Sequence, residues 1–486
     1  MAHYPKIFDF TGSGGGSFSI DLNEIAFGTG TGITSSTIFT FDNVNSNLLA
    51  STASQLNGSL CSIVVGGSTN IIEDSCLSSI IGGYNNTLNF SRVSSIIGGQ
   101  NNNVCSYVSS IIGGSNNVVT YSESSSIIGG NLNIIASQSC ESSIFGGNEN
   151  CILYGSDDSS IIGGSYNTIA TQSGRSSIIA GTNNTLICTN SSMVSGDFNT
   201  IVKSGLSIIT GNNNKITYYS NNSSIIGGSS NTLNCYSNNS SIIGGYSNTL
   251  NCHSNNSSII GGCFNTIDTL SCNSSIIGGF TNNIFYASRS SMIAGGCFNT
   301  IATSSCNSSI LGGECNTISY SSDFSSITGG RNNIITCTLN SSIISARQSI
   351  ISTQSFYSSI VGGYRNTLNF SRYSSIIGGY QNSIISQYRQ VSVSILGGRC
   401  NEITGRSCIS SIISSYSSTM SCSCNSVILG GVGLELCSKN STVLVPNFFI
   451  SGSMSPDNGI NYGINSTFST DGFTFCICNG VIVSKF

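Results

Sequence analysis

The most regular stretch of the 486-residue sequence is Ser258-Ile259-Ile260-Gly261-Gly262-Cys263-Phe264-Asn265-Thr266-Ile267. Outward from it the phrase returns in steps of mostly 15 to 17 residues, giving 24 copies in all, most of them with the Gly-Gly pair. A short fixed period repeated this often is the signature of a solenoid, in which each copy is one coil stacked on the next. In the middle of the chain the step is always 17 residues, and the first glycines are Gly227, Gly244, Gly261, Gly278, Gly295, Gly312 and Gly329.

Each copy has the same internal pattern, which we number from the first glycine of the pair as position 0. Positions −2 and +6 are apolar in all 24 copies, and position +4 is Asn in every copy from Asn70 to Asn333. The longest interval between pairs is 19 residues and is filled largely by Ser, Asn and Gly. Short β-branched runs between Gly and Asn are typical of strands. Each coil is therefore predicted to hold two short strands and two bends, and no helix.

The Ile-Ile doublet at positions −2 and −1 predicts assembly. Successive side chains of a strand point to opposite faces, so this strand is apolar on both faces in coil after coil. The second strand instead alternates, with Asn at +4, Thr at +5 and Ile or Leu at +6. Because the chain offers no helix as a cover, another copy of the same protein is the natural partner. We expect an obligate oligomer, with −2 and +6 inside each coil and −1, including Phe145 and Leu311, between chains.

Composition agrees with a long stacked structure. Charged residues make up only 7% of the chain, whereas 38% is hydrophobic, which excludes a disordered tail. The prolines are Pro5, Pro446 and Pro456, so no proline interrupts a strand ladder between residues 6 and 445. At ~4.8 Å per coil, 24 coils would make a rod on the order of 115 Å long. The net charge of −4 argues against nucleic acid as a partner, and no run is long enough for membrane insertion.

The repeat divides the chain into three predicted segments. Residues 1–44 lie outside it and are expected to form an N-terminal attachment or lead-in segment. Residues 45–437 hold the β-solenoid repeats. Residues 438–486 are expected to form a C-terminal β cap, including a hairpin of 473–478 and 481–483 around an Asn-Gly turn. Small β caps at the ends would protect strand edges that otherwise recruit further strands.

The repeat Ser-Ser-Ile-Ile-Gly-Gly-x-x-Asn-Thr-Ile resembles the head repeats of trimeric adhesins, which form trimeric left-handed parallel β-rolls. The lead-in at 23–42 and the closing segments 471–475 and 479–482 resemble fibre and tail proteins of viruses and phages. The coils are longer than the usual adhesin head coil, and the self-cleaving chaperone domain of many viral fibres is not recognisable. The resemblance implies an all-β parallel solenoid of about 24 coils that forms a homotrimer around its Ile-Ile strands.

The resemblance also implies a function. We expect a structural virion fibre or spike, a rigid trimeric rod made in the host cytoplasm and carried on the virion surface. One end would bind a capsid or tail protein, and the rod would mediate attachment to a host-surface glycan. A cell-surface trimeric adhesin is the alternative, although the start of the chain lacks a secretory signal. A glycan-cleaving tailspike is a second alternative.

No catalytic, cofactor-binding or metal-binding residues are predicted, and the protein is not expected to be an enzyme. The histidines are His3 and His253, too few for a His-centred triad or a His-rich metal site. A glycosidase needs two carboxylates roughly 5–9 Å apart. Glu141 and Asp158 fall at the same phase one coil apart, but no cleft-forming insertion accompanies them, and a solvated surface is expected. The other acidic residues considered are Glu73, Asp74, Glu149 and Asp157.

Asn and Cys are given structural roles. The Asn side chains at +4 are predicted to stack in register along the sheet as a hydrogen-bonded ladder. The 21 cysteines lack the spacing of a metal site, although Cys235 and Cys252 share a phase in adjacent coils. We expect most cysteines to be free thiols that pack as small apolar residues.

One band near the end of the repeat is strongly basic. Residues 331–406 include seven arginines but only one carboxylate, Glu402, which gives a local net charge of 7 − 1 = +6. The 19-residue step places the extra residues 387–390 on the outside of a coil in this band. Arginine forks suit carboxylate or sulfate groups, and exposed Tyr offers a flat face to a sugar, so an anionic glycan is the expected ligand. A solvated basic stripe is the alternative. The predicted glycan- or receptor-binding residues are Arg331, Arg347, Arg365, Arg372, Arg389, Arg399, Arg406, Tyr364, Tyr373, Tyr380 and Tyr388.

Overall fold

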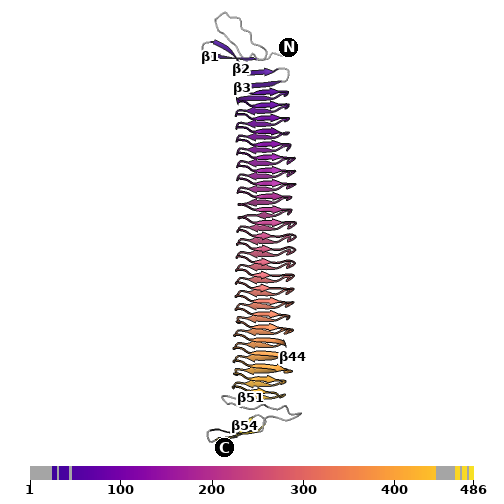
Figure 1. Cartoon of the computed structure of the whole chain (residues 1–486), viewed down its shortest axis with the longest axis vertical. Coiled ribbons are helices and arrows are strands. Elements are labelled where there is room, and N and C mark those ends of the chain that lie inside the picture. The colour runs from indigo at the N-terminus through magenta and orange to yellow at the C-terminus, as the bar shows by residue number, and fades with distance from the viewer. Residues whose placement is uncertain are drawn as a thin grey trace, which may run out of the picture. The chain divides into compact units, whose positions relative to one another are not determined.

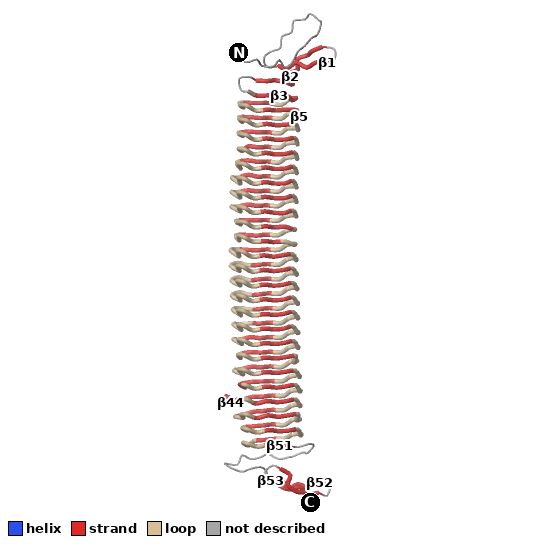
Figure 2. Tube along the Cα trace, turned by 180° about the vertical axis from the view of Figure 1, so that it is seen from behind, coloured by secondary structure: helices blue, strands red, loops and turns tan. Residues whose placement is uncertain are grey.

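The computed structural model describes residues 24–29, 32–42, 46–444, 466–470, 473–478 and 481–485. This part of the chain is an all-β parallel β-solenoid of about 22 coils, without a helix. The predicted all-β parallel solenoid is confirmed, with slightly fewer coils than the 24 copies expected, while the homotrimer and the terminal caps remain predictions. Chain contacts group the residues into two compact units, Met1–Arg175 and Ser176–Phe486. Within each unit the coils are stacked, and every coil alternates strands with bends (Figures 1 and 2).

In the first unit β1 (Glu24–Thr29) and β2 (Gly32–Asp42) are antiparallel, and β2 pairs antiparallel with β3 (Asn47–Thr52). From β3 onward every pairing is parallel and joins neighbouring coils. Sheet A continues with β5 (Ile63–Ser68), β7 (Ser79–Ile81), β9 (Ser95–Ile97), β11 (Ser110–Ile112), β13 (Ser126–Ile128), β15 (Ser143–Phe145) and β17 (Ser160–Ile162). Sheet B holds β4 (Gln55–Asn57), β6 (Ile71–Glu73), β8 (Thr87–Asn89), β10 (Asn103–Cys105), β12 (Val118–Thr120), β14 (Ile134–Ala136), β16 (Cys151–Leu153) and β18 (Thr168–Ala170).

The second unit repeats this arrangement. Sheet A strands are β19 (Ser177–Ile179), β21 (Met193–Ser195), β23 (Ile208–Ile209), β25 (Ser224–Ile226), β27 (Ser241–Ile243), β29 (Ser258–Ile260), β31 (Ser275–Ile277), β33 (Met292–Ala294), β35 (Ser309–Leu311), β37 (Ser326–Thr328), β39 (Ser342–Ile344), β41 (Ser359–Val361), β43 (Ser375–Ile377), β45 (Val393–Leu396), β47 (Ser410–Ile413), β49 (Val427–Leu429) and β51 (Thr442–Leu444). Sheet B strands are β20 (Thr185–Ile187), β22 (Thr200–Val202), β24 (Lys215–Thr217), β26 (Thr232–Leu233), β28 (Thr249–Leu250), β30 (Thr266–Ile267), β32 (Asn283–Ile284), β34 (Thr300–Ile301), β36 (Thr317–Ser319), β38 (Ile334–Thr336), β40 (Ile350–Ser352), β42 (Thr367–Arg372), β44 (Ser383–Val391), β46 (Glu402–Gly405), β48 (Thr419–Ser421) and β50 (Glu435–Leu436). A separate antiparallel sheet consists of β52 (Ser466–Thr470), β53 (Phe473–Cys478) and β54 (Val481–Lys485).

The core of each coil lies between the two sheets. Ile259 at position −2 and Ile267 at position +6 are both fully buried. The strand register aligns equivalent residues of neighbouring coils, so Ile259 pairs with Ile276 of the next coil. Stacked β-branched side chains fill the space between the sheets in each coil. Position +6 is confirmed as an inside position, and position −2 is confirmed in most coils.

The copies at Ser195 and Thr210 contradict the −2 assignment, because Val194 and Ile209 at −1 are buried there while Met193 and Ile208 at −2 are exposed. Both copies follow a 15-residue step, and the sheet register keeps the buried residues aligned by moving the inside position by one residue.

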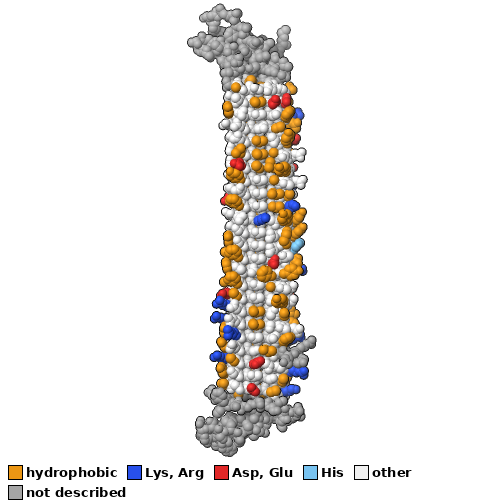
Figure 3. Space-filling model, viewed as in Figure 1, with side chains coloured by type: hydrophobic (Ala, Val, Ile, Leu, Met, Phe, Trp, Pro, Cys, Tyr) orange, Lys and Arg blue, Asp and Glu red, His pale blue; other side chains and the backbone are white. Residues whose placement is uncertain are grey.

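Position −1 points out of the coil. Ile260 is 42% exposed, and Phe145 and Leu311 are exposed to a similar extent. Hydrophobic side chains consequently recur along the surface of the stack (Figure 3). The outward orientation predicted for −1 is confirmed in most coils, including those of Phe145 and Leu311, and is wrong at Val194 and Ile209, which are buried. Its burial by another chain remains a prediction.

The Gly-Gly bend is closed by the Asn ladder. Both glycines have positive φ, +68° at Gly261 and +76° at Gly262. The Asn265 side-chain amide donates to the Gly279 carbonyl at 3.3 Å, and its oxygen accepts the Asn282 N–H at 2.9 Å. Asn265 is completely buried, so these bonds satisfy a polar group inside the stack. The predicted structural role of the Asn ladder is confirmed.

The opposite bend is closed by two further ladders, of Ser, which the sequence reading did not assign. Ser254 at −7 and Ser257 at −4 are buried. The backbone N–H of Ser257 donates to the Ser240 hydroxyl at 3.1 Å, and the Ser257 hydroxyl donates to the Ser271 carbonyl at 3.0 Å. Each coil thus hydrogen-bonds to its neighbours through side chains at both bends.

Two predictions concern irregular segments. The predicted hairpin strands are paired in β53 and β54, while the Asn-Gly turn lies outside the described residues. The extra residues of the 19-residue step lie in β44. Ile385 pairs with Asn369 and Gln390 pairs with Ser371, so residues 386–389 have no partner in β42. They form a bulge opposite a single β42 residue, at the place where the insertion was predicted.

Candidate binding surfaces

The residue at position +2 stacks on its counterpart in the next coil. After the two glycines this residue forms a single parallel bridge, as between Tyr364 and Tyr380. The bridges align part of the predicted basic band on one bend of the second unit, where Figure 3 shows a series of Lys and Arg side chains along one edge. We call the following set the arginine–tyrosine column: Arg331, Arg347, Tyr364, Arg365, Tyr380, Arg399 and Tyr416.

Guanidinium groups pack over phenol rings in this column. The Arg365 guanidinium lies 5.0 Å from the Tyr364 ring centroid, and that of Arg347 lies 5.6 Å from the same ring. The Arg399 guanidinium is 4.8 Å from the Tyr380 ring, and the two tyrosine rings are 5.3 Å apart. Cation–π contacts at this range are worth about 0.5–1 kcal/mol each at exposed sites. The rings therefore hold the arginines in an ordered array on the surface.

The charge of the column is mostly unneutralised. The Arg331 guanidinium forms an ion pair with Glu314 at 3.2 Å. The Arg365 Nε–H donates to the Gln348 side-chain oxygen at 3.0 Å. The two ion pairs found among the described residues involve neither Arg347, Arg365 nor Arg399. Three guanidinium groups thus remain available to an anionic ligand.

The other predicted site residues lie elsewhere. Arg372 packs over Phe356 at the opposite bend, with the guanidinium 4.7 Å from the ring centroid, and Tyr373 stacks on Tyr357 at 5.1 Å. Arg406 is exposed beyond β46. The side chains of Tyr388 and Arg389 lie outside the described residues. Of the eleven predicted residues, the structure therefore brings six together in the column and places Arg372, Tyr373 and Arg406 apart from it.

Sequence reading missed three residues of this surface. Tyr416 extends the column, Glu314 begins it, and Gln348 orients Arg365. All three occupy position +2 or +3 of their coils. Reading down these two positions, rather than counting charges between 331 and 406, would have found them.

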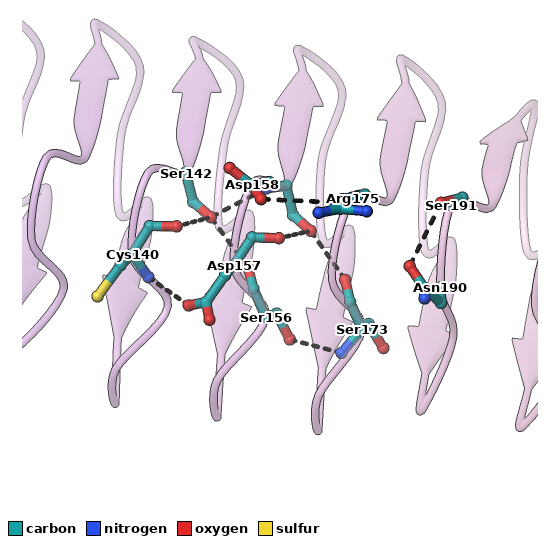
Figure 4. Close-up of polar contacts among 10 residues, drawn as sticks. Cys140, Ser142, Ser156, Asp157, Asp158, Ser173, Arg175, Asn190 and Ser191 are labelled. Atoms are coloured by element: carbon teal, nitrogen blue, oxygen red, sulfur yellow. Dashed lines mark hydrogen bonds and ion pairs between the residues drawn. The ribbon is translucent and has the colours of Figure 1, made fainter.

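The acidic residues of the first unit take part in local contacts (Figure 4). One oxygen of Asp157 accepts the Cys140 backbone N–H at 2.7 Å. Asp158 forms an ion pair with Arg175 at 3.7 Å. The Asp158 backbone N–H donates to the Cys140 carbonyl, which places Asp158 in the coil next to Glu141 at the predicted matching phase. The two aspartates thus help to fix the bends.

The prediction that most cysteines are free thiols is confirmed for the described residues. Fifteen of these cysteines are free, and all fifteen are at least partly exposed. Two disulfides are the exceptions. Cys235 bonds to Cys252, the pair noted for its shared phase, and Cys408 bonds to Cys424, each bond joining adjacent coils.

Two thiols are expected to react slowly. Burial raises the pKa of the Cys105 thiol, and burial followed by the Glu149 charge raises the pKa of the Cys151 thiol. A raised pKa lowers the fraction of reactive thiolate at a given pH. At pH 8 iodoacetamide should label both residues more slowly than the exposed Cys61. Peptide mass spectrometry over time measures the order, and equal labelling rates would contradict it.

The described residues contain no group of three or more His, Cys, Asp or Glu side chains arranged for a metal ion. They also contain no helix that is long and apolar enough to cross a membrane. Neither the protein-family models nor the curated proteins include a match to this chain. The protein can therefore be assigned to a fold class, the all-β parallel β-solenoids.

Proposed function

We propose that the protein is a structural fibre protein that assembles as a homotrimer and attaches to an anionic glycan on a host surface. The carrying observation is the arginine–tyrosine column, an ordered basic and aromatic array on an otherwise weakly charged solenoid. The virion setting rests on the resemblance of the repeats and end segments to viral fibre proteins. In that setting the chain would act as a rod without catalysis or cofactor.

The outward apolar stripe supports assembly. Position −1 is exposed and apolar through most coils, and a contiguous apolar surface of this kind marks an interaction site. A second chain of the same sequence and period would match it coil for coil. Three chains packed through these faces would bury the stripe and leave the arginine–tyrosine column, which lies beyond the glycine bend, for a ligand.

The column suits a sulfated or carboxylated sugar. Arginine forks bind such groups through paired hydrogen bonds, and the coil spacing of ~4.8 Å presents them at regular intervals along an extended polymer. The tyrosine rings add flat apolar faces between the charges. A homotrimer would display three copies and raise the avidity further.

Charge reversal tests the proposal. The double variant Arg365→Glu and Arg399→Glu should weaken binding to immobilised heparin or polysialic acid by at least about tenfold. Binding by the parent protein should become weaker as the salt concentration rises. The matched control is Arg372→Glu with Arg406→Glu, which makes the same charge change at other positions of the solenoid. Surface plasmon resonance on the full chain measures both. Unchanged binding in the first pair, or an equal loss in the control, would refute the column as the site.

A further inference from the structure

The first unit carries a groove at the bend that follows sheet B. It encloses about 800 Å³, within the range of known ligand sites. A smaller hollow continues it past Tyr154 and shares Tyr121 and Gln138 with it. The main groove is lined by Phe90, Cys105, Ser106, Tyr107, Tyr121, Glu123, Gln138, Cys140, Gly155, Asp157 and Gln172.

The groove is long because its walls are columns of the solenoid. The lining residues come from six successive coils, which at ~4.8 Å per coil span about 24 Å. One wall follows the positions of Tyr107, Glu123 and Asp157, which recur at the same phase. The wall formed by Tyr121 and Gln138 runs beside it, joined by the bond from the Gln138 N–H to the Tyr121 carbonyl at 2.8 Å. An extended chain fits this shape better than a compact ligand.

Aromatic rings stand along the groove. Tyr121 is 72% exposed and Tyr154 is 60% exposed, while Phe90 and Tyr107 are also exposed. Gly155 follows Tyr154 and carries no side chain, so the surface beside that ring stays open. Exposed rings held at successive coils offer apolar faces to the C–H faces of sugar rings.

The polar groups of the groove are acceptors and amides rather than cations. Glu123 and Asp157 carry negative charge, Gln138 and Gln172 provide both donors and acceptors, and neither Lys nor Arg lines the groove. Carboxylates accept hydrogen bonds from hydroxyl groups, and amides can both donate and accept. The two negative charges would repel an anionic sugar, in contrast to the arginine–tyrosine column.

We propose that this groove binds an extended, uncharged oligosaccharide. The hydroxyl groups of the sugar would donate to Glu123 and Asp157, and its rings would lie against Tyr121 and Tyr154. The site belongs to the first unit alone and does not depend on the anionic-glycan site proposed for the second. The chain would then bind two kinds of sugar, an uncharged one in this groove and an anionic one at the arginine–tyrosine column.

The test uses the full chain and a panel of neutral hexasaccharides: maltohexaose, cellohexaose, mannohexaose and chitohexaose. Isothermal titration calorimetry should detect binding of at least one. Tyr121→Ala and Tyr154→Ala should each weaken that binding by about tenfold. Both residues are exposed, so the coil should remain folded, which circular dichroism can verify.

Two controls make the result specific. Tyr166→Ala removes another exposed tyrosine of the same unit that does not line the groove, and should leave binding unchanged. The variant Arg365→Glu with Arg399→Glu should also retain it, which separates this site from the arginine–tyrosine column. Failure of every hexasaccharide to bind, or equal binding to the parent and Tyr121→Ala, would overturn the proposal.

Discussion

Ile259→Asp is expected to unfold the coils around it and to lower the free energy of unfolding by more than about 4 kcal/mol per chain. Ile259 is fully buried between the sheets, in register with Ile276 of the next coil. An aspartate there would bury a charge without a partner, and the stack is too thin to relax around it. Because each coil supports its neighbours, the damage should spread along the solenoid. Circular dichroism during heating measures the loss.

The adjacent residue provides the matched control. Ile260 lies on the same strand but points outward, so Ile260→Asp should leave a single chain folded. If three chains pack through position −1, this variant should dissociate into folded monomers while the parent is a trimer, as light scattering would detect. A parent that is monomeric in solution would contradict the proposed assembly. A heat-resistant Ile259→Asp protein would contradict the inside–outside assignment.

The sequence was sufficient for the core and for one bend. The strict period fixes which residues stack, because equal phase in a solenoid means direct contact between coils. Ile259 and Ile267 could be placed inside, and Asn265 in a ladder, from that period alone. The Ser ladders through Ser254 and Ser257 had the same signal but were obscured, since Ser also occupies the half-buried position −3 in most coils, as at Ser258.

The binding surface was harder to predict, for a geometric reason. Counting charge along the chain merges the two bends of each coil, although they lie on opposite edges. Arg347 and Arg372 were therefore grouped, whereas their aromatic partners, Tyr364 and Phe356, belong to different bends. The first-unit groove carried no sequence signal of its own, because its tyrosines and carboxylates come from six coils and only their phase unites them.

The register shift at β44 illustrates a further limit. A 19-residue step in a series of shorter steps indicates extra residues but not where the sheet accommodates them. In β44 the pairing with β42 stops at Ile385 and resumes at Gln390, so residues 386–389 bulge opposite a single β42 residue. Because the ladder resumes beyond the bulge, the disruption is confined to this coil.

Gly262→Ala is expected to destabilise the protein strongly, whereas Gly261→Ala should cost only the backbone term that both variants share. A Cβ at Gly262 would lie 2.4 Å from both the Asn265 amide nitrogen and the Gly279 carbonyl oxygen, while a Cβ at Gly261 would meet no atom within 4 Å. Both glycines have positive φ, so the backbone cost of about 1–2 kcal/mol is common to the two variants. Their difference isolates the clash. Ala180 already occupies position 0 with a positive φ, which shows that this position accepts a Cβ.

The chain itself indicates how the clash can be relieved. Ala346 and Ser415 replace the second glycine in two coils, and in both coils the residue at +4 is Ser rather than Asn, namely Ser349 and Ser418. A Cβ at +1 and an Asn at +4 thus compete for the same space. Gly262→Ala should cost about 3 kcal/mol or more, and adding Asn265→Ser should recover part of that loss despite removing ladder bonds. Thermal unfolding of the two single variants and the double variant gives the coupling. Strictly additive losses would show that the Gly279 carbonyl, rather than the Asn ladder, is what requires glycine at this position.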